Sequence, residues 1–120
     1  MSSHLVLVEF AAAKTVYIPF YRNMTLTSAK FVSTASVTKD GSNYFELRVY
    51  ANDATEVMAT WQSSSSGQDF TGGTPVSKTL ANTDEGDFSA SQVCKVEAAT
   101  TGSGAIAGIL MLEFSDARSY

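Results

Sequence analysis

The chain has 120 residues, the size of one domain, and 44% of them are hydrophobic, which provides a core and excludes an intrinsically disordered chain. Only 17% are charged, the net charge is −4, and the eight Lys and Arg residues are dispersed, so we expect no nucleic-acid partner. The single cysteine, Cys94, excludes an intramolecular disulfide framework and a cysteine-rich metal site, and we expect it to pack as a small buried hydrophobe.

The N-terminal segment MSSHLVLVEF has an apolar run of four residues that stops at Glu9. This run is too short for a signal peptide and far too short to span a bilayer, so we expect no membrane partner and synthesis in a reducing cytoplasm. Its alternation favours an extended strand over a helix across residues 5–14. We expect residues 14–120 to form a β-sandwich domain. Residues 1–13 are either an arm that docks on a neighbour or the first strand of this sandwich.

Alternation with a period of two recurs along the rest of the chain, which is typical of half-buried strands. Pro19 cannot donate a backbone hydrogen bond, so it predicts a sheet edge or a bulge. Met58 is predicted to face outward with Glu56 and Thr60. The residues predicted to face inward are Val16, Ile18 and Phe20; Phe45, Leu47 and Val49; Val57, Ala59 and Trp61; and Cys94, Val96 and Ala98.

Turn-forming residues separate the predicted strands. Residues 39–43 (KDGSN) predict a hairpin loop, and residues 51–55 (ANDAT) predict a second tight turn. Residues 63–75 are polar and glycine-rich, which predicts a mobile connection, and residues 82–91 predict another polar loop. Seven or eight short strands in one domain indicate an all-β fold, an antiparallel β-sandwich or jelly roll.

The segment TTGSGAIAGILMLEF could be a phosphate-binding loop, a membrane span or a turn before a strand. The spacing of Gly102, Gly104 and Gly108 misses the dinucleotide fingerprint by one residue, no Lys follows as a P-loop requires, and too few residues remain for a Rossmann unit. Glu113 interrupts the apolar run, which excludes a membrane span. We therefore predict a hairpin that returns from the strand at 92–99. The residues predicted to face inward in its last strand are Leu110, Leu112 and Phe114.

Residues for catalysis or metal binding are scarce. His4 is the single histidine, so a Ser–His–Asp arrangement would have to recruit it. We expect no enzyme activity, no catalytic residues, no cofactor and no metal site of the zinc or non-haem iron type. The acidic residues Asp84, Glu85 and Asp87 lack the ligand series of an EF-hand, and they fit either a solvated loop or a weak calcium site.

Aromatic residues offer an alternative kind of site. Exposed rings stack on sugars in carbohydrate-binding β-sandwich modules, whereas buried rings form the core and tyrosines also suit protein interfaces. Trp61 shares its predicted face with Val57 and Ala59, which favours the core. The candidate glycan or interface aromatics are Tyr17, Tyr21, Tyr44, Tyr50 and Trp61.

Four structural motifs follow one another between about residues 11 and 114. They are an x-Pro strand (Ile18-Pro19), a strand with Lys30-Phe31-Val32, the strand from Asn43 to Val49, and a T-G-x-G turn (Thr101 to Gly104) before the last apolar strand. In this order, the motifs resemble the small β-sandwich proteins of tailed bacteriophages that serve as capsid decoration (cement) or head-fibre proteins.

The resemblance implies a non-enzymatic virion structural protein that binds the major capsid protein on the outer surface of the phage head and stabilises contacts between capsomers. It also implies synthesis in the bacterial host cytoplasm, and the symmetry of capsids suggests a homotrimer. Alternatives are a phage tail or fibre component, or a carbohydrate-binding module that recognises a receptor. The candidate docking residues, which could add a strand to a neighbour's open sheet edge, are His4, Leu5, Val6, Leu7, Val8 and Phe10.

Overall fold

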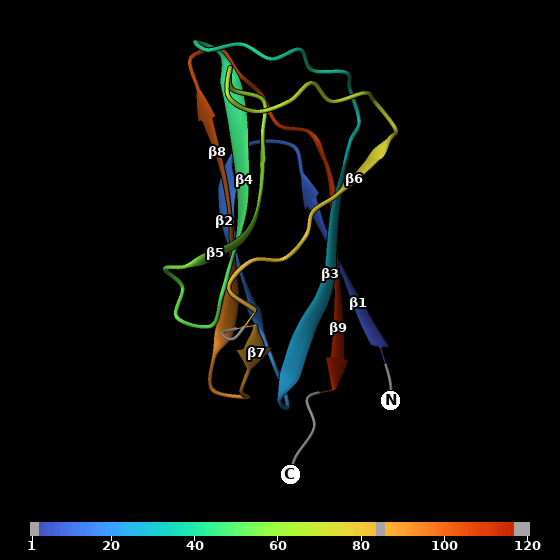
Figure 1. Cartoon of the computed structure of the whole chain (residues 1–120), viewed down its shortest axis with the longest axis vertical. Helices are drawn as coiled ribbons and strands as arrows, with labels where there is room; N and C mark the ends of the chain where they lie inside the picture. The colour runs from blue at the N-terminus through green and yellow to red at the C-terminus, as the bar shows by residue number, and fades with distance from the viewer. Residues whose placement is uncertain (1–2, 84–85, 117–120) are drawn as a thin grey trace.

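The structure is a computed structural model that describes residues 3–83 and 86–116. These residues form nine β-strands in two antiparallel sheets, which pack face to face (Figure 1). The predicted all-β antiparallel sandwich is confirmed. Within the same residues there is no helix with the length and hydrophobicity needed to cross a bilayer.

Many strands that are consecutive in the sequence lie in different sheets. Sheet A has the order β1 (Ser3–Phe10), β9 (Gly108–Asp116), β3 (Met24–Ser33) and β6 (Pro75–Ser77), and β7 (Asp87–Phe88) also pairs with β3. Sheet B has the order β2 (Lys14–Pro19), β8 (Val93–Thr101), β4 (Tyr44–Tyr50) and β5 (Val57–Gln62). Strands β1 to β4 therefore alternate between the sheets, which is the arrangement of a jelly roll. Because β2 is an edge strand of sheet B, Pro19 lies at a sheet edge as predicted.

Aromatic side chains join the two sheets. Phe31 of sheet A and Phe45 of sheet B have ring centres 5.8 Å apart, and the ring of Phe70 lies 5.0 Å from that of Phe45. Trp61 of β5 is fully buried, and its Nε1–H donates a hydrogen bond of 2.8 Å to the carbonyl of Val76 in β6. This bond connects the two sheets directly and satisfies the buried indole nitrogen.

The alternation in the sequence correctly predicts the buried inward faces of three strands, and it fails in one. Along β2 and just after it, Ile18 is buried and Val16 and Phe20 pack against the core, as predicted. In β5, Met58 was predicted to face outward but is buried. The chain after β6 covers this side of β5: the Ala81 N–H donates to the Met58 carbonyl (2.9 Å), and Gly86 lies against the Met58 side chain. The inward faces predicted correctly are Phe45, Leu47 and Val49; Cys94, Val96 and Ala98; and Leu110, Leu112 and Phe114.

Of the two predicted tight turns, one connects paired strands and one does not. Residues 51–55 join β4 to β5 in sheet B, where the Asp53 carboxylate accepts hydrogen bonds from the N–H groups of Thr55 and Glu56. Residues 39–43 lead from β3 in sheet A to β4 in sheet B, so the predicted hairpin is wrong and the chain crosses between sheets. The Asp40 carboxylate accepts backbone hydrogen bonds within this crossing, which lowers its pKa.

The predicted hairpin at the glycine-rich segment is also wrong. β8 belongs to sheet B and β9 to sheet A, so residues 102–107 carry the chain across the sandwich. Gly102 has a positive φ of 62°, and Gly104 approaches the backbone of Tyr44 so closely that a side chain would not fit. Ile106 is buried in the core. The glycines do form a turn before a strand, as predicted, but this turn leads the chain from sheet B to sheet A.

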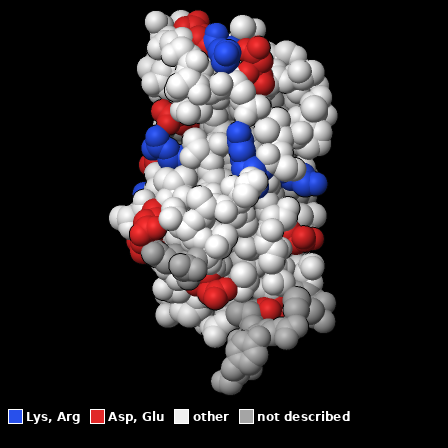
Figure 2. Space-filling view, viewed as in Figure 1, with Lys and Arg blue, Asp and Glu red and all other residues white. Residues whose placement is uncertain are grey.

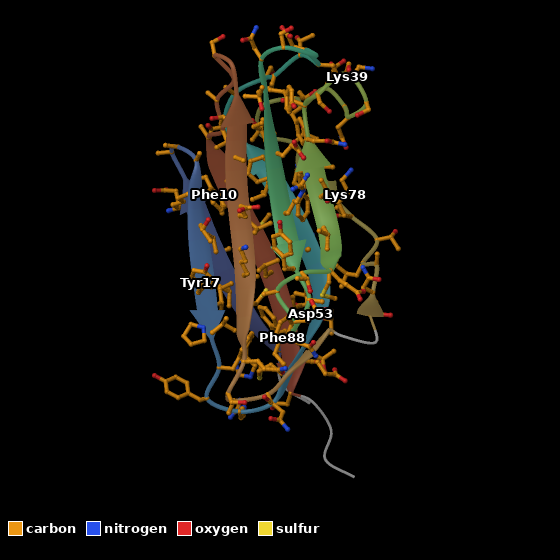
Figure 3. All side chains as sticks on the ribbon, turned by 90° about the vertical axis from the view of Figure 1, so that its left-hand side faces the viewer. Phe10, Tyr17, Lys39, Asp53, Lys78 and Phe88 are labelled. Atoms are coloured by element: carbon orange, nitrogen blue, oxygen red, sulfur yellow. The ribbon has the colours of Figure 1, made fainter. Side chains whose placement is uncertain are left out.

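The long polar connection at residues 63–75 is anchored to the core, which the prediction of a mobile segment missed. Phe70 is buried, and its backbone exchanges two hydrogen bonds of 2.8 Å with Val37. Likewise, the predicted loop at 82–91 contains β7 and the buried Phe88, which Figure 3 places in the lower part of the sandwich. In each case a single aromatic residue within polar sequence fixes the chain to the core.

Cys94 is fully buried in β8 and packs as a small hydrophobe, as predicted. Burial raises the pKa of its thiol to about 12, because the thiolate is poorly solvated in the core. The side chain is therefore protonated at neutral pH and is not a nucleophile in the folded protein.

We expect Gly104→Ala to lower the free energy of unfolding by about 2 kcal/mol, because the added Cβ would overpack a close backbone contact. That Cβ would lie 2.3 Å from the Tyr44 carbonyl oxygen. Urea denaturation followed by Trp61 fluorescence measures the change. Gly41→Ala is the matched control, since its Cβ would meet Ser65 at an ordinary 3.4 Å, and it should change stability by less than about 0.5 kcal/mol. Equal losses in the two variants would contradict the close approach.

The raised pKa of Cys94 predicts a loss of stability at high pH. The thiol ionises near pH 9.0 in the unfolded chain but only near about 12 in the folded protein. Its contribution is therefore fully present below pH 9.0 and is lost as the pH rises toward 12, by up to about 1.4 kcal/mol per pH unit. Urea denaturation between about pH 8 and pH 11 should show a steeper decline for the wild type than for Cys94→Ala. Parallel curves for the two proteins would refute this account.

Candidate interaction surface

The outer face of sheet B carries charged and polar side chains that pair with one another. Arg48 forms an ion pair with Glu46, and the Tyr50 hydroxyl donates a hydrogen bond of 2.9 Å to Glu97. The ammonium group of Lys95 lies 4.9 Å from the centre of the Tyr50 ring. Figure 3 looks onto this face, where β2, β8, β4 and β5 lie side by side. Because these groups satisfy one another, covering this face with a partner would require their desolvation.

The outer face of sheet A is apolar at its centre. Leu5 and Leu7 of β1 are 63% and 59% exposed, which is high for leucine. The strand register places Leu7 beside Met111 of β9, and Ile109 beside Val32 of β3. These five residues form a contiguous surface, which we call the apolar patch. The charged residues around it are Glu9, Lys30 and Glu113.

The composition of the patch was only partly predictable from the sequence. Leu5 and Leu7 were among the candidate docking residues, whereas Val32, Ile109 and Met111 were not. The available signal was a last strand with apolar residues on both faces, since Ile109 and Met111 alternate with buried residues and yet are themselves hydrophobic. A strand with one solvated face ordinarily places polar residues there.

Residues 3–10, considered as either an arm or a first strand, form β1 of the chain's own sandwich and pair with β9. Val8 and Phe10 are buried to 7% and 2% exposure, so their side chains belong to the core and are not accessible for docking. Leu5 and Leu7 point to the opposite side, because successive side chains of a strand alternate between its faces. The two remaining candidates, His4 and Val6, line a cavity.

This cavity lies between the edge strands β1 and β2 and has a volume of about 260 Å³. At its rim, Arg22 donates a hydrogen bond of 2.8 Å from Nε to Asp116, and its Nη2 lies 2.9 Å from the Nε2 atom of His4. The same Nε2 atom of His4 lies 3.4 Å from Oδ1 of Asp116. Among residues 3–83 and 86–116, that nitrogen contacts the Arg22 guanidinium and the Asp116 carboxylate and not a serine hydroxyl, which differs from the geometry of a catalytic triad. The apolar part of the lining comprises Val6, Ile18, Pro19, Phe20, Met24 and Phe114.

The candidate aromatic residues are dispersed. Trp61 and Tyr50 are buried, so their rings are not accessible to a sugar, and Tyr44 is half-buried. Tyr17 is 58% exposed on β2, and Tyr21 is fully exposed after it (Figure 3 labels Tyr17). Only this last pair has the accessibility that stacking on a ligand needs.

Charged residues do not form a concentrated site on the described surface. Figure 2 shows Lys and Arg side chains interspersed with Asp and Glu over one face of the molecule. Within residues 3–83 and 86–116, no group of three or more His, Cys, Asp and Glu residues is arranged to hold a metal ion. Of the acidic cluster, Asp84 and Glu85 lie outside the described residues, and Asp87 accepts a hydrogen bond from the Thr25 hydroxyl.

Comparisons with known proteins give a structural neighbour. No protein-family model matches the chain, and none of the curated proteins matches it either. Among solved structures, the chain is similar to one described as the structure of infectious bursal disease virus, Gx strain, with 13% sequence identity and a TM-score of 0.43. The superposition covers 100% of this chain and 35% of that chain, so this chain spans about a third of the length of its neighbour.

Proposed function

We propose that this chain is a non-enzymatic structural protein of a virion, which binds the outer surface of a phage head as a decoration protein and stabilises contacts between capsomers. The observation that carries the proposal is the apolar patch on sheet A, where Leu5 and Leu7 are mostly exposed. An apolar centre surrounded by charged residues is the composition of a protein interface. The resemblance of the strand and turn motifs to phage decoration proteins supports the class of partner.

Sheet A is the face that fits a large partner, because covering it releases water from apolar side chains without separating ion pairs. Burial of apolar surface contributes roughly 25 cal/mol per Å². On sheet B, by contrast, a partner would have to desolvate Glu46, Arg48 and Glu97, which interact within the face. The shell protein would therefore contact the outer sides of β1, β9 and β3.

We expect Met111→Glu to weaken binding to mature, expanded head shells by at least about tenfold, because it places a charge at the centre of the apolar patch. Co-sedimentation of purified protein with shells measures the binding. Thr60→Glu is the matched control, since Thr60 lies on the outer face of sheet B beside Arg48 and should tolerate the same side chain without loss of binding. Removing residues 2–10 would be a poor test, because Val8 and Phe10 belong to the core.

Two results would contradict the proposal. One is equal sedimentation of wild type and Met111→Glu with shells, which would remove the apolar patch from the binding surface. The other is a location on the tail in electron micrographs of labelled particles, which would indicate a tail or fibre component instead of a decoration protein.

A carbohydrate-binding module is the second candidate function, favoured by the exposed pair Tyr17 and Tyr21. Stacking on a sugar would bury the two rings, of which Tyr21 lines the cavity between β1 and β2. This function predicts binding on a glycan array that is lost in the double variant Tyr17→Ala/Tyr21→Ala and retained in Met111→Glu. An absence of glycan binding by the wild type would eliminate this candidate.

A further inference from the structure

Three of the four sheet edges in the sandwich carry features that prevent pairing with another strand. The outer edge of β5 is covered by the chain that follows it, which donates hydrogen bonds to carbonyl groups of this strand. The Gln68 N–H donates to Gln62 (3.0 Å), and the Asn82 side chain donates to Val57 (2.8 Å). Covering an edge in this way is one of the means by which natural sheets avoid aggregation.

The edges formed by β6, β7 and β2 are protected from pairing in other ways. β6 has three residues and begins with Pro75, and β7 has two residues, so neither offers a long ladder. β2 begins with Lys14 and ends with Pro19, and both are exposed. Short strands, lysine and proline are known features of protected edges, since proline lacks the N–H group that a ladder requires.

β1 lacks every one of these features. It has eight residues, pairs with β9 in an unbroken register from Ser3 to Phe10, and contains no proline, lysine, arginine or glycine. In an antiparallel strand, about half of the backbone N–H and C=O groups point away from the strand's partner. Among residues 3–83 and 86–116, β9 is the strand that pairs with β1, so the opposite side of β1 is a long edge without a bulge beside two exposed leucines.

We propose that this edge pairs with the same edge of a second copy of the chain. The two strands run antiparallel, and the two-fold axis passes between Val6 of one copy and Val6 of the other. In this register Leu5 lies opposite Leu7 of the second copy, and Ser3 lies opposite Glu9. Residues 3–9 of the two copies then form about six to eight backbone hydrogen bonds. Four leucines meet across the axis, no like charges stand opposite each other, and sheet A becomes one continuous sheet.

The register follows from the side chains of β1. A two-fold axis perpendicular to the sheet requires opposing residues to share a face. Each alternative register therefore moves the partner of a given residue by two positions along β1. One alternative places Leu5 opposite Glu9, which buries a carboxylate against an apolar side chain. Another places Leu7 opposite Ser3 and pairs fewer residues. Each alternative keeps one leucine–leucine pair, on the axis itself, and the register centred on Val6 is the one that places both leucines of each copy opposite leucine.

A homodimer follows from this geometry, because an edge that pairs with itself forms a closed isologous contact and leaves no site for a third copy. The trimer suggested by capsid symmetry would instead need two different edges, and in the part of the chain that the structure describes β1 is the one edge without protection. The two apolar patches merge into a single surface in the dimer. The proposal goes beyond a role in the virion, because the dimer forms without any shell and is measured on the purified protein.

Sedimentation equilibrium of the full chain tests the dimer. We expect the wild type at twice the chain mass of 12.8 kDa, and the double variant Leu5→Glu/Leu7→Glu at the mass of one chain. Met111→Glu is the control, since it adds a glutamate to the same face one strand away from the edge and should remain dimeric. Circular dichroism spectra that match the wild type show that both variants retain the fold.

Cross-linking tests the register. The two thiols introduced by Val6→Cys face each other across the axis, and mild oxidation should give a covalent dimer. In Leu7→Cys the two introduced thiols are diagonal neighbours about 7–8 Å apart, and the yield should be at least several-fold lower. Cys94 does not interfere, because it is buried.

Several results would overturn the proposal. They are a wild type with the mass of one chain or of three, a dimer that persists in Leu5→Glu/Leu7→Glu, or a higher cross-linking yield for Leu7→Cys than for Val6→Cys. Amide hydrogens of β1 that become protected only after shell protein is added would show that a shell strand occupies the edge instead. A dimer that forms normally but does not bind shells would leave this inference intact and refute the proposed function.

Discussion

Packing of aromatic rings between the two sheets is the interaction on which the rest of the structure depends. Phe31 of sheet A contacts Phe45 of sheet B, and Phe70 and Trp61 surround this pair from loops and strands distant in sequence. The side chains between the sheets hold them together, and the chain also crosses repeatedly from one sheet to the other. Once these rings are buried, the outward residues of every strand are determined, since side chains alternate along a strand. The composition of the two outer faces is therefore a consequence of core packing.

The jelly-roll path explains why the chain crosses between sheets where tight turns alone would suggest hairpins. β1 pairs with β9 and β2 pairs with β8, so the connection from β1 to β2 and the connection from β8 to β9 cross the sandwich side by side. In the same way, β3 leads across to β4, and the hairpin of β4 and β5 lies at the centre of the path. The glycines at 102 and 104 permit the second crossing, because a larger residue would collide with the backbone of Tyr44 or be strained.

The surface chemistry of the two sheets and the state of their edges point to one side of the molecule for association. Sheet B has polar and charged groups that interact with one another, and its edges are covered or contain proline and lysine. Sheet A has exposed leucines and one long unprotected edge, both on β1. A strand with these properties is an aggregation hazard unless it is covered in the assembled state. The same eight residues thus contribute to the core through Val8 and Phe10, and in the proposed dimer they associate through Leu5 and Leu7.

The sequence by itself determined the all-β fold, the inward faces of β4, β8 and β9, the burial of Cys94 and the position of Pro19 at an edge, because alternation and backbone chemistry are local properties. It also identified Leu5 and Leu7 as candidates. Only the tertiary structure decided which strands share a sheet, because a glycine turn has the same local chemistry whether it joins paired strands or opposite sheets. Likewise, burial of Met58, Phe70 and Phe88 depends on segments remote in sequence that cover them. The apolar patch needs the register of β1, β9 and β3, which brings together residues separated by about a hundred positions, and no local pattern encodes that register.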